Sequence, residues 1–320
     1  MYVLGIESTA HTFGVGIVQD GKIIASQRDT LRPESGGIIP REAANHHYKL
    51  AHSIINAALD EAGLKLSDID SFAFSQGPGI LSPLKVGYQV ASFLGKKFGK
   101  RVIGVNHCIA HLEIARLLTG FDDPLMLYVS GGNTQVITFQ EGRYRVFGET
   151  QDIGLGNLID KVGRELGIPF PAGPKIEQYA SSGKKYINMP YSIKGMDVSF
   201  SGLATFISKI IGKEKVEDIC YSLQETVFSM VIEASERAMA YCGKDTMVIT
   251  GGVAANSRLN QMGEKMCGQR GAKFRRIPMQ YAGDNGAMIA YAGYLMPKTS
   301  EVSLMPKPIF RTDSVEIRYR

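Results

Sequence analysis

A pattern of apolar strands around a polar turn occurs twice in the chain, and it constrains the fold more than any other feature of the sequence. In the first copy, strands are predicted at residues 2–7 and 13–18, with a third at 22–28 after the turn Asp20-Gly21. The corresponding strands of the second copy are predicted at 125–130, 135–140 and 143–148. The repeat predicts an internal duplication with a boundary near residue 120, and hence two domains, 1–120 and 121–320. Two β-meanders that are alike by chance are the alternative.

Helices and strands alternate through the rest of the chain. Helices are predicted at 41–62, 83–98, 156–166, 200–211, 215–242 and 284–296. Two more are predicted to begin after Asn106, which is the N-cap, and at about residue 255. Further strands are predicted at 70–75, 101–105, 246–250 and 273–277. Alternation of this kind predicts layers of an α/β fold.

Composition limits the class of protein. A chain of 320 residues suggests two domains, and it has no run of about 18 apolar residues that would predict a transmembrane helix. The first residues lack the features of a signal peptide, and none of the four cysteines forms a CxxC pair, so a cytoplasmic location is expected. The net charge of +5 weakly favours a polyanionic partner, although proteins without one often carry such a charge.

Two glycine pairs, Gly131-Gly132 and Gly251-Gly252, each follow an apolar strand. Because glycine has no Cβ, the backbone N–H groups of such a turn can hold a phosphate closely. The helix predicted after Gly252 adds the positive end of its dipole. Ordinary structural turns explain most single glycine pairs, so both interpretations stay open.

Two common nucleotide-binding motifs are missing from the sequence. A Walker A motif needs Ser or Thr after Gly-Lys, and no G-x-G-x-x-G opens a helix here either. No Gly-Lys pair here is followed by Ser or Thr; after the pairs at Gly95, Gly183, Gly212 and Gly243, for example, come Lys, Lys, Glu and Asp. A bound nucleotide would therefore need a different fold.

His107 and His111 are four residues apart in a segment predicted as helical, so both imidazoles lie on one helical face. Imidazole pairs at this spacing suit zinc or iron. A metallopeptidase of the H-E-x-x-H type is not indicated, because Cys108 occupies the position of the general-base glutamate. Two polar residues in a first helical turn, without a metal, are the alternative.

Three acidic residues, Asp160, Glu177 and Asp284, are candidates for a site, yet each has a simple structural explanation. Asp160 could pair with Arg164 one helical turn later. Glu177 could be a solvated helix residue, and Asp284 could cap the last helix.

Eight short strings, in order, resemble the tRNA threonylcarbamoyladenosine transferases, a family once named O-sialoglycoprotein endopeptidases. The strings are Gly5-Ile6-Glu7-Ser8-Thr9, Gln76-Gly77-Pro78-Gly79, Asn106-His107-Cys108-Ile109-Ala110-His111, Tyr128-Val129-Ser130-Gly131-Gly132-Asn133-Thr134, Phe170-Pro171-Ala172-Gly173-Pro174, Ser199-Phe200-Ser201-Gly202-Leu203, Gly251-Gly252-Val253-Ala254-Ala255-Asn256 and Gly283-Asp284-Asn285. The resemblance extends from residue 3 to about residue 296. Tyr128 and Asn133 resemble the archaeal and eukaryotic branch, which works inside the KEOPS complex.

This resemblance implies an actin/Hsp70-like fold of two duplicated domains with a nucleotide cleft. It implies one divalent metal per subunit, with iron expected and zinc as the alternative, bound by His107, His111, Tyr128 and Asp284. It also implies an adenylate-containing substrate surrounded by Tyr128, Val129, Ser130, Gly131, Gly132, Asp160, Gly173, Glu177 and Asn256.

The implied activity is transfer of the threonylcarbamoyl group from threonylcarbamoyl-AMP to N6 of the adenosine 3′ of the anticodon, in tRNAs reading ANN codons. Asp160 and Glu177 would bind ribose hydroxyls, and the sequence identifies no general base. The implied partners are tRNA, a kinase-like ATPase subunit and a small dimer-forming subunit of KEOPS, without a membrane. Basic clusters at 96–101 and 273–276 could contact tRNA or could be solvated faces.

Two other functions stay open: an ATPase or kinase-like enzyme of the same fold, and a non-catalytic nucleotide-binding scaffold. ATPases of this fold typically carry an aspartate in each repeated hairpin. Here Glu7 and Tyr128 occupy comparable positions, which favours acyl transfer over phosphate hydrolysis. Residues 297–320 fit a packed strand or tail, and also a boundary before a further module.

Overall fold

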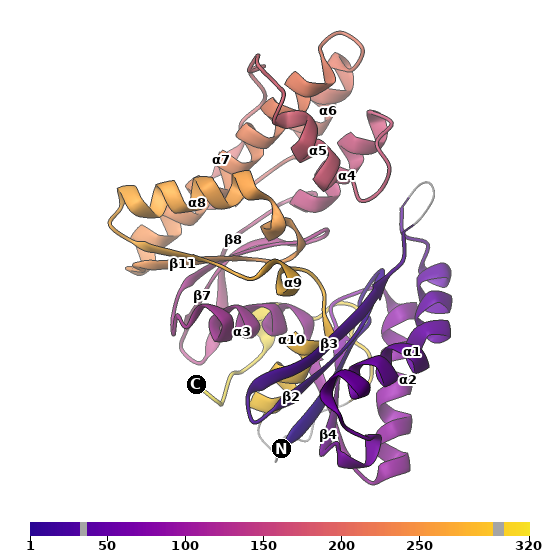
Figure 1. Cartoon of the computed structure of the whole chain (residues 1–320). Coiled ribbons are helices and arrows are strands. Elements are labelled where there is room, and N and C mark those ends of the chain that lie inside the picture. The colour runs from indigo at the N-terminus through magenta and orange to yellow at the C-terminus, as the bar shows by residue number, and fades with distance from the viewer. Residues whose placement is uncertain (33–36, 297–303) are drawn as a thin grey trace.

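The computed structural model describes residues 1–32, 37–296 and 304–320, and it shows two five-stranded mixed sheets with helices layered against them (Figure 1). The first sheet has the order β3-β2-β1-β4-β5 and the second the order β12-β11-β6-β7-β8. Their strands are β1 (Tyr2–Glu7), β2 (Thr12–Gln19), β3 (Lys22–Thr30), β4 (Ser71–Gly77), β5 (Arg101–Asn106), β6 (Leu125–Val129), β7 (Thr134–Gln140), β8 (Arg143–Glu149), β11 (Thr246–Thr250) and β12 (Lys273–Arg276).

Both sheets have the same topology. Three strands form an antiparallel meander, and two further strands run parallel to the first strand of that meander. The duplication predicted from the sequence is confirmed, and each predicted strand of these sheets agrees with the observed strand within two residues.

The same turn closes the second hairpin of both meanders. Asp20 and Gly21 have φ values of 47° and 81°, and Glu141 and Gly142 have values of 51° and 72°. Two consecutive residues with positive φ form the type I′ turn, whose twist matches that of the flanking strands. Glycine at the second position takes up this conformation without steric strain, so the Asp-Gly and Glu-Gly pairs set the register of both hairpins.

Helices cover both faces of the first sheet. Helices α1 (Pro40–Ala62) and α2 (Leu81–Phe98) pack on one face, where Leu4, Ile6 and Phe72 belong to the same apolar cluster as Ile55 and Leu94. Helices α3 (His107–Thr119) and α10 (Gly286–Leu295) pack on the other face. The sheet is therefore buried between two helical layers, one of which includes α10 from residues 286–295.

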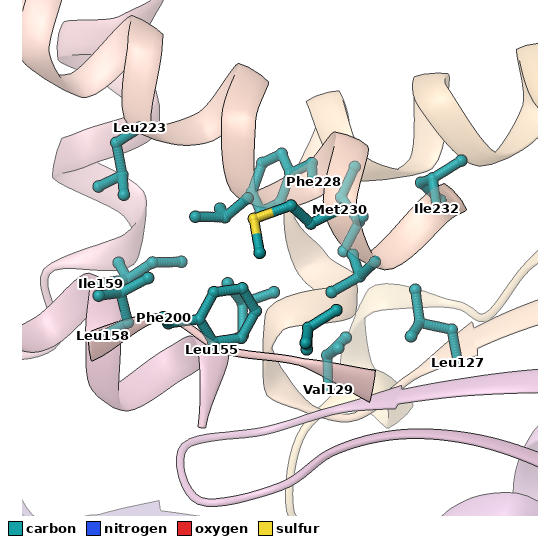
Figure 2. Packing of buried hydrophobic residues seen from close by; sticks show 14 of the residues in the cluster. Leu127, Val129, Leu155, Leu158, Ile159, Phe200, Leu223, Phe228, Met230 and Ile232 are labelled. Carbon is teal, nitrogen blue, oxygen red and sulfur yellow. The ribbon is translucent and has the colours of Figure 1, made fainter. Parts of the chain in front are cut away.

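A larger core lies on one face of the second sheet. Leu127 and Val129 of β6 meet Leu155, Phe200 and Phe228 there, all fully buried (Figure 2). The helices of this layer are α4 (Leu155–Glu165), α5 (Gly173–Ala180), α6 (Ser201–Ile210), α7 (Val216–Cys242) and α8 (Ser257–Gln269). The opposite face of the same sheet packs on α3, so α3 lies between the two sheets.

Several short elements were not predicted. They are the 3₁₀ turns at Leu66–Asp68, Gly252–Ala255 and Thr312–Ser314, the β9 (Ile193–Lys194) and β10 (Asp197–Val198) pair, and helices α5 and α9 (Met279–Ala282). The helix expected from about 255 begins at Ser257, after the 3₁₀ turn. The last helix begins at Gly286 rather than 284 because Asn285 is its N-cap, accepting a hydrogen bond from the Met288 N–H at 3.0 Å.

The strands of the first sheet all precede residue 120, and those of the second all follow it. Helix α10 nevertheless packs on β1 and β2 of the first sheet. The division into domains 1–120 and 121–320 remains a proposal. The strands are divided in this way, but α10 lies with the first sheet in space. No helix within the described ranges is both long and apolar enough to cross a membrane.

The end of the chain forms a tail across both sheets, in agreement with the packed tail expected for its described part. The Lys307 N–H donates to Gln76 O at 2.7 Å, and the Gly79 N–H donates to Pro308 O at 3.1 Å. Further on, the Ile317 N–H donates to Gly142 O at 2.8 Å, and its side chain is buried beside α3. Residues 297–303, which belong to the same expected segment, lie outside the described residues.

The contact of α10 with the first sheet predicts a steric penalty at Gly16. A Cβ there would lie 2.2 Å from Ala287 N, a backbone atom that cannot move aside alone. We expect Gly16→Ala to reduce the free energy of unfolding by about 3 kcal/mol or more, measured by chemical denaturation. The control is Gly268→Ala on the exposed side of α8, where a Cβ meets nothing within 4 Å and should add roughly 0.5–1 kcal/mol. Equal stability of Gly16→Ala and the unaltered chain would contradict the close packing.

Candidate functional site

Three side chains that can bind a metal converge between the sheets. His107 and His111 lie on α3, and Asp284 lies in the loop before α10. Their ligand atoms all lie within 4.8 Å of one another. Asp284 Oδ1 is 3.5 Å from His107 Nε2 and 3.2 Å from His111 Nε2. The i,i+4 pair predicted from the sequence therefore faces the predicted acidic partner, and Asp284 is not the cap of α10.

Local capping fixes the position of this centre. Asn106 caps α3 by accepting a hydrogen bond from the Ile109 N–H at 3.1 Å, as predicted. Arg28 donates from Nη1 to Asp284 O at 3.0 Å, which ties the loop to β3. Both histidines sit in the first turns of a helix whose start is fixed, and the carboxylate sits in a loop held at both ends.

Glu7 supports the first histidine from behind. Its Oε2 is 2.9 Å from His107 Nδ1, and its Oε1 accepts hydrogen bonds from the backbone N–H and hydroxyl of Thr9. Burial opposes the charged imidazole, but the Glu7 and Asp284 carboxylates outweigh it and raise the pKa of His107 to about 9. A carboxylate on Nδ1 fixes the tautomer and leaves Nε2 to face Asp284, as in carboxylate–histidine–metal arrangements.

Two buried polar atoms at the centre lack protein partners. Among the described residues, Tyr128 Oη and His111 Nδ1 make no hydrogen bond, and the two rings lie 5.2 Å apart. Leaving such atoms unpaired costs free energy, so an unpaired group in a native core indicates a ligand or ion that pairs with it. Two imidazoles, a carboxylate and a phenol oxygen form a donor set that fits iron or zinc. Burial raises the pKa of Tyr128 in this pocket.

The two glycine turns lie side by side next to this centre. Strands β6 and β11 are parallel neighbours, with Thr250 paired to Tyr128, so the turns Ser130–Asn133 and Gly251-Gly252 leave the same sheet edge. Gly251 has φ of 94°, and a Cβ there would be 2.4 Å from Val129 O. A Cβ on Gly132 or Gly252 would meet nothing within 4 Å. Ligands of open α/β sheets bind outside the carboxyl ends of parallel strands, which is where these turns lie.

The other predicted substrate residues lie on the helices beyond the turns, and several make internal bonds. Asp160 Oδ1 accepts from the Ala172 N–H at 2.8 Å, and burial raises the pKa of its carboxyl group. It forms no ion pair with Arg164 in the described part of the chain. Gly173 opens α5, and a Cβ there would meet open space.

Glu177 and Asn256 join α5, α7 and the start of α8. Glu177 Oε1 accepts from the Ser257 N–H at 2.9 Å and from its hydroxyl, so Glu177 is not simply a solvated residue. Asn256 accepts from the Leu259 N–H at 3.1 Å and donates to Gln224 Oε1 at 2.7 Å. Because both ends of this amide are engaged, it positions the turn after Gly252, and its contact with an adenylate remains a prediction.

His11 lies near Asp160 and Asp284 and was not predicted as a site residue. It sits in the turn between β1 and β2, and its ring packs edge-on against Phe170 of the second half at 5.5 Å. His11 has no second candidate ligand at a regular spacing in the sequence, so its residue type gave no signal of a site. The repeat does give such a signal, because the turn that carries His11 in the first meander corresponds to the glycine turn Ser130–Asn133 in the second.

Two sheets of the same topology, each backed by helices, give the chain an actin/Hsp70-like fold. The structure is similar to T. kodakarensis HypF, with a TM-score of 0.65 over 92% of this chain and 47% of that one. It is also similar to the activator of 2-hydroxyisocaproyl-CoA dehydratase from Clostridium difficile, solved with bound ADPNP, with a TM-score of 0.55 over 92% and 94% of the two chains. Sequence identity is 14% in both cases, so these likenesses show the fold alone.

A family profile described as tRNA N6-adenosine threonylcarbamoyltransferase matches residues 21–291. The protein of that name from Thermococcus kodakarensis is 51% identical over 323 residues, which cover 99% of each chain. The chain belongs to this family of transferases, as the sequence motifs predicted.

Other relatives are longer. The "Probable bifunctional tRNA threonylcarbamoyladenosine biosynthesis protein" of Methanosarcina mazei is 52% identical over 325 residues, which cover 99% of this chain and 59% of that protein. The chain therefore spans about three fifths of the length of that relative.

The metal centre predicts that His111→Ala removes most of the bound metal, because it deletes one of the imidazole ligands. Metal content of the purified protein should be measured by elemental mass spectrometry, with circular dichroism as the check on folding. The control is His52→Ala on the exposed side of α1, where the imidazole hydrogen-bonds to Asn56 and metal content should not change. Full metal content in the His111 variant would show that these residues do not bind the ion.

The open space beside Gly252 allows a clean steric test of the nucleotide site. Gly252→Val places a side chain where the protein itself has no atoms within 4 Å, so the fold should tolerate it. We expect adenylate affinity to fall at least tenfold, about 1.4 kcal/mol, in calorimetric titrations. Gly268→Val, in an equally open position on α8, should bind the adenylate like the unaltered chain. Unchanged affinity of the Gly252 variant would make the turn merely structural.

Proposed function

We propose that the chain transfers a threonylcarbamoyl group from threonylcarbamoyl-AMP to N6 of the adenosine 3′ of the anticodon, in tRNAs reading ANN codons. The observation that carries this proposal is the position of the His107, His111 and Asp284 centre, directly beside two glycine turns in a chain of this family. An acyl-adenylate requires a group that polarises its acyl oxygen and a turn that binds its phosphate.

The chain's own groups divide the donor between them. The backbone N–H groups of the turns at Gly131 and Gly252 would bind the phosphate, where glycine lets them approach. Asp160 keeps Oδ2 without a hydrogen-bond partner in the described residues, and this oxygen can accept a ribose hydroxyl. Glu177 would orient the turn that carries Gly252 through its bonds to Ser257, and its expected contact with the ribose remains part of the proposal.

His107, His111, Tyr128 and Asp284 would hold one divalent metal, iron with zinc as the alternative. When bound, the metal supplies Lewis-acid polarisation of donor oxygens. Glu7 is engaged with His107 and Thr9, so it does not offer the free carboxylate that organises magnesium and water in related ATPases. This engagement supports acyl transfer over phosphate hydrolysis.

In the transfer, the bond between N6 and the carbamoyl carbon forms, and the bond from that carbon to the phosphate oxygen breaks. AMP leaves with the electron pair, and N6 gives up one proton. We further propose that the chain works in the cytoplasm with a kinase-like ATPase subunit and a small dimer-forming subunit of a KEOPS complex. The isolated chain should bind tRNA weakly and in a salt-dependent manner, since its basic clusters are small.

The function is tested by incubating the chain with threonylcarbamoyl-AMP and tRNA, with and without the two partner subunits, at one salt concentration. Digested tRNA should contain threonylcarbamoyladenosine by mass spectrometry, with more product when the partners are present. His111→Ala is the negative control and His52→Ala the matched positive control. ATP hydrolysis at an ordinary enzymatic rate without any modified nucleoside would contradict the transferase, and equal rates with and without partners would contradict the complex.

A further inference from the structure

His11 has a side chain whose Nδ1 is buried and makes no hydrogen bond with any described residue. Its backbone is fixed, because the Leu31 N–H donates to His11 O at 2.9 Å. An imidazole held in place with a buried unpaired nitrogen loses free energy unless another molecule pairs with it.

The surroundings of His11 place it between the two halves of the proposed site. Its ring packs on Phe170, two residues before Ala172, whose N–H binds Asp160. The His11 ring also lies close enough to Asp160, and to Asp284 of the candidate metal centre, to interact with both carboxylates. His11 is thus near both the proposed ribose site and the proposed metal site, without being a member of either.

His11 also comes from the half of the chain that does not carry the glycine turns. The turn that carries it follows β1 of the first sheet, whereas the proposed phosphate cradle follows β6 and β11 of the second. An amine adds to one face of the planar carbamoyl carbon, and the phosphate then leaves from the tetrahedral adduct. A group on the first half of the chain can serve this amine without occupying the turns that hold the phosphate.

The other bases near the centre have partners or an assigned role. Glu7 binds His107 and Thr9, and His107 and His111 face Asp284. Asp160 accepts from the Ala172 N–H with one oxygen, and its other oxygen is assigned to a ribose hydroxyl. Neutral imidazole always keeps one nitrogen as an acceptor, and it is the side chain best suited to take a proton near neutrality.

Resting on the function proposed above, we propose that His11 is the general base that takes the N6 proton of the target adenosine during acyl transfer. As N6 bonds to the carbamoyl carbon and the carbon–oxygen bond to AMP breaks, the proton passes from N6 to an imidazole nitrogen of His11. The imidazolium then returns the proton to solvent, so atoms and charges balance without a further reactant.

The test is single-turnover transfer by the full complex, with saturating threonylcarbamoyl-AMP and tRNA. His11→Ala should lower the transfer rate about 100-fold or more, the usual contribution of a general base. His11→Asn should be similarly slow, because its amide hydrogen-bonds but does not accept a proton at neutral pH. Added imidazole should restore part of the transfer rate of His11→Ala, but not that of His11→Asn. The transfer rate of the complex with His52→Ala should match that of the unaltered complex.

Metal content, thermal stability and adenylate affinity of both His11 variants should match those of the unaltered chain. A full rate in His11→Ala would overturn the proposal, and so would a full rate in His11→Asn, which would indicate hydrogen bonding only. A loss in His11→Ala that imidazole does not restore would also overturn it. If the alanine variant fails to fold, the rate of the asparagine variant decides. No modified nucleoside from the unaltered complex would instead refute the transferase function itself.

Discussion

The close approach of α10 to the first sheet is the contact on which the site depends. A Cβ on Gly5, Gly16 or Gly286 would lie between 2.1 and 2.2 Å from backbone atoms across this interface, so glycine is required on both sides. Because α10 lies directly on β1 and β2, the loop before it brings Asp284 to His107 and His111. A displacement of the helix by the width of one methyl group would separate the carboxylate from the imidazoles.

Helix α3 connects this centre to the second sheet. Two residues after His111, the fully buried Glu113 accepts from Tyr144 Oη at 2.7 Å and from Tyr319 Oη at 3.2 Å, and pairs with Arg116 at 2.7 Å. A buried carboxylate is tolerated only when its oxygens are satisfied in this way. The network therefore fixes α3 against β8 and the tail. The first turns of the same helix carry two of the candidate metal-binding groups.

Local patterns in the sequence predicted the elements that have local causes. Alternating apolar residues and the Asp20-Gly21 and Glu141-Gly142 turns specify both meanders, and the four-residue spacing of His107 and His111 follows from helical geometry. Contacts between distant segments could not be predicted in this way. Asp284 and Asn285 are both good caps by residue type, and only the path of the chain into α10 decides that Asn285 is the cap.

The same limit applies to the candidate site. The acceptor role of Glu177 depends on Ser257, which lies on another helix, and the position of His11 depends on Phe170. The short helix α5 was missed because eight residues, with Gly173 and Pro174 at the start, give too little periodicity. The family motifs named most of the site residues, but their partners come only from the three-dimensional arrangement.

The position of α10 after all the strands of both sheets has a consequence for synthesis on the ribosome. The first sheet is translated early, yet the face made by Val3, Ala73 and Ile103 is covered by Ala287, Met288 and their neighbours. Until residues 286–295 emerge, that apolar face is without its helix, so the first sheet alone is an incomplete unit. Domains usually fold in order as they leave the ribosome. Here the first lobe and the candidate metal centre are completed together, only once residues 286–295 have been translated.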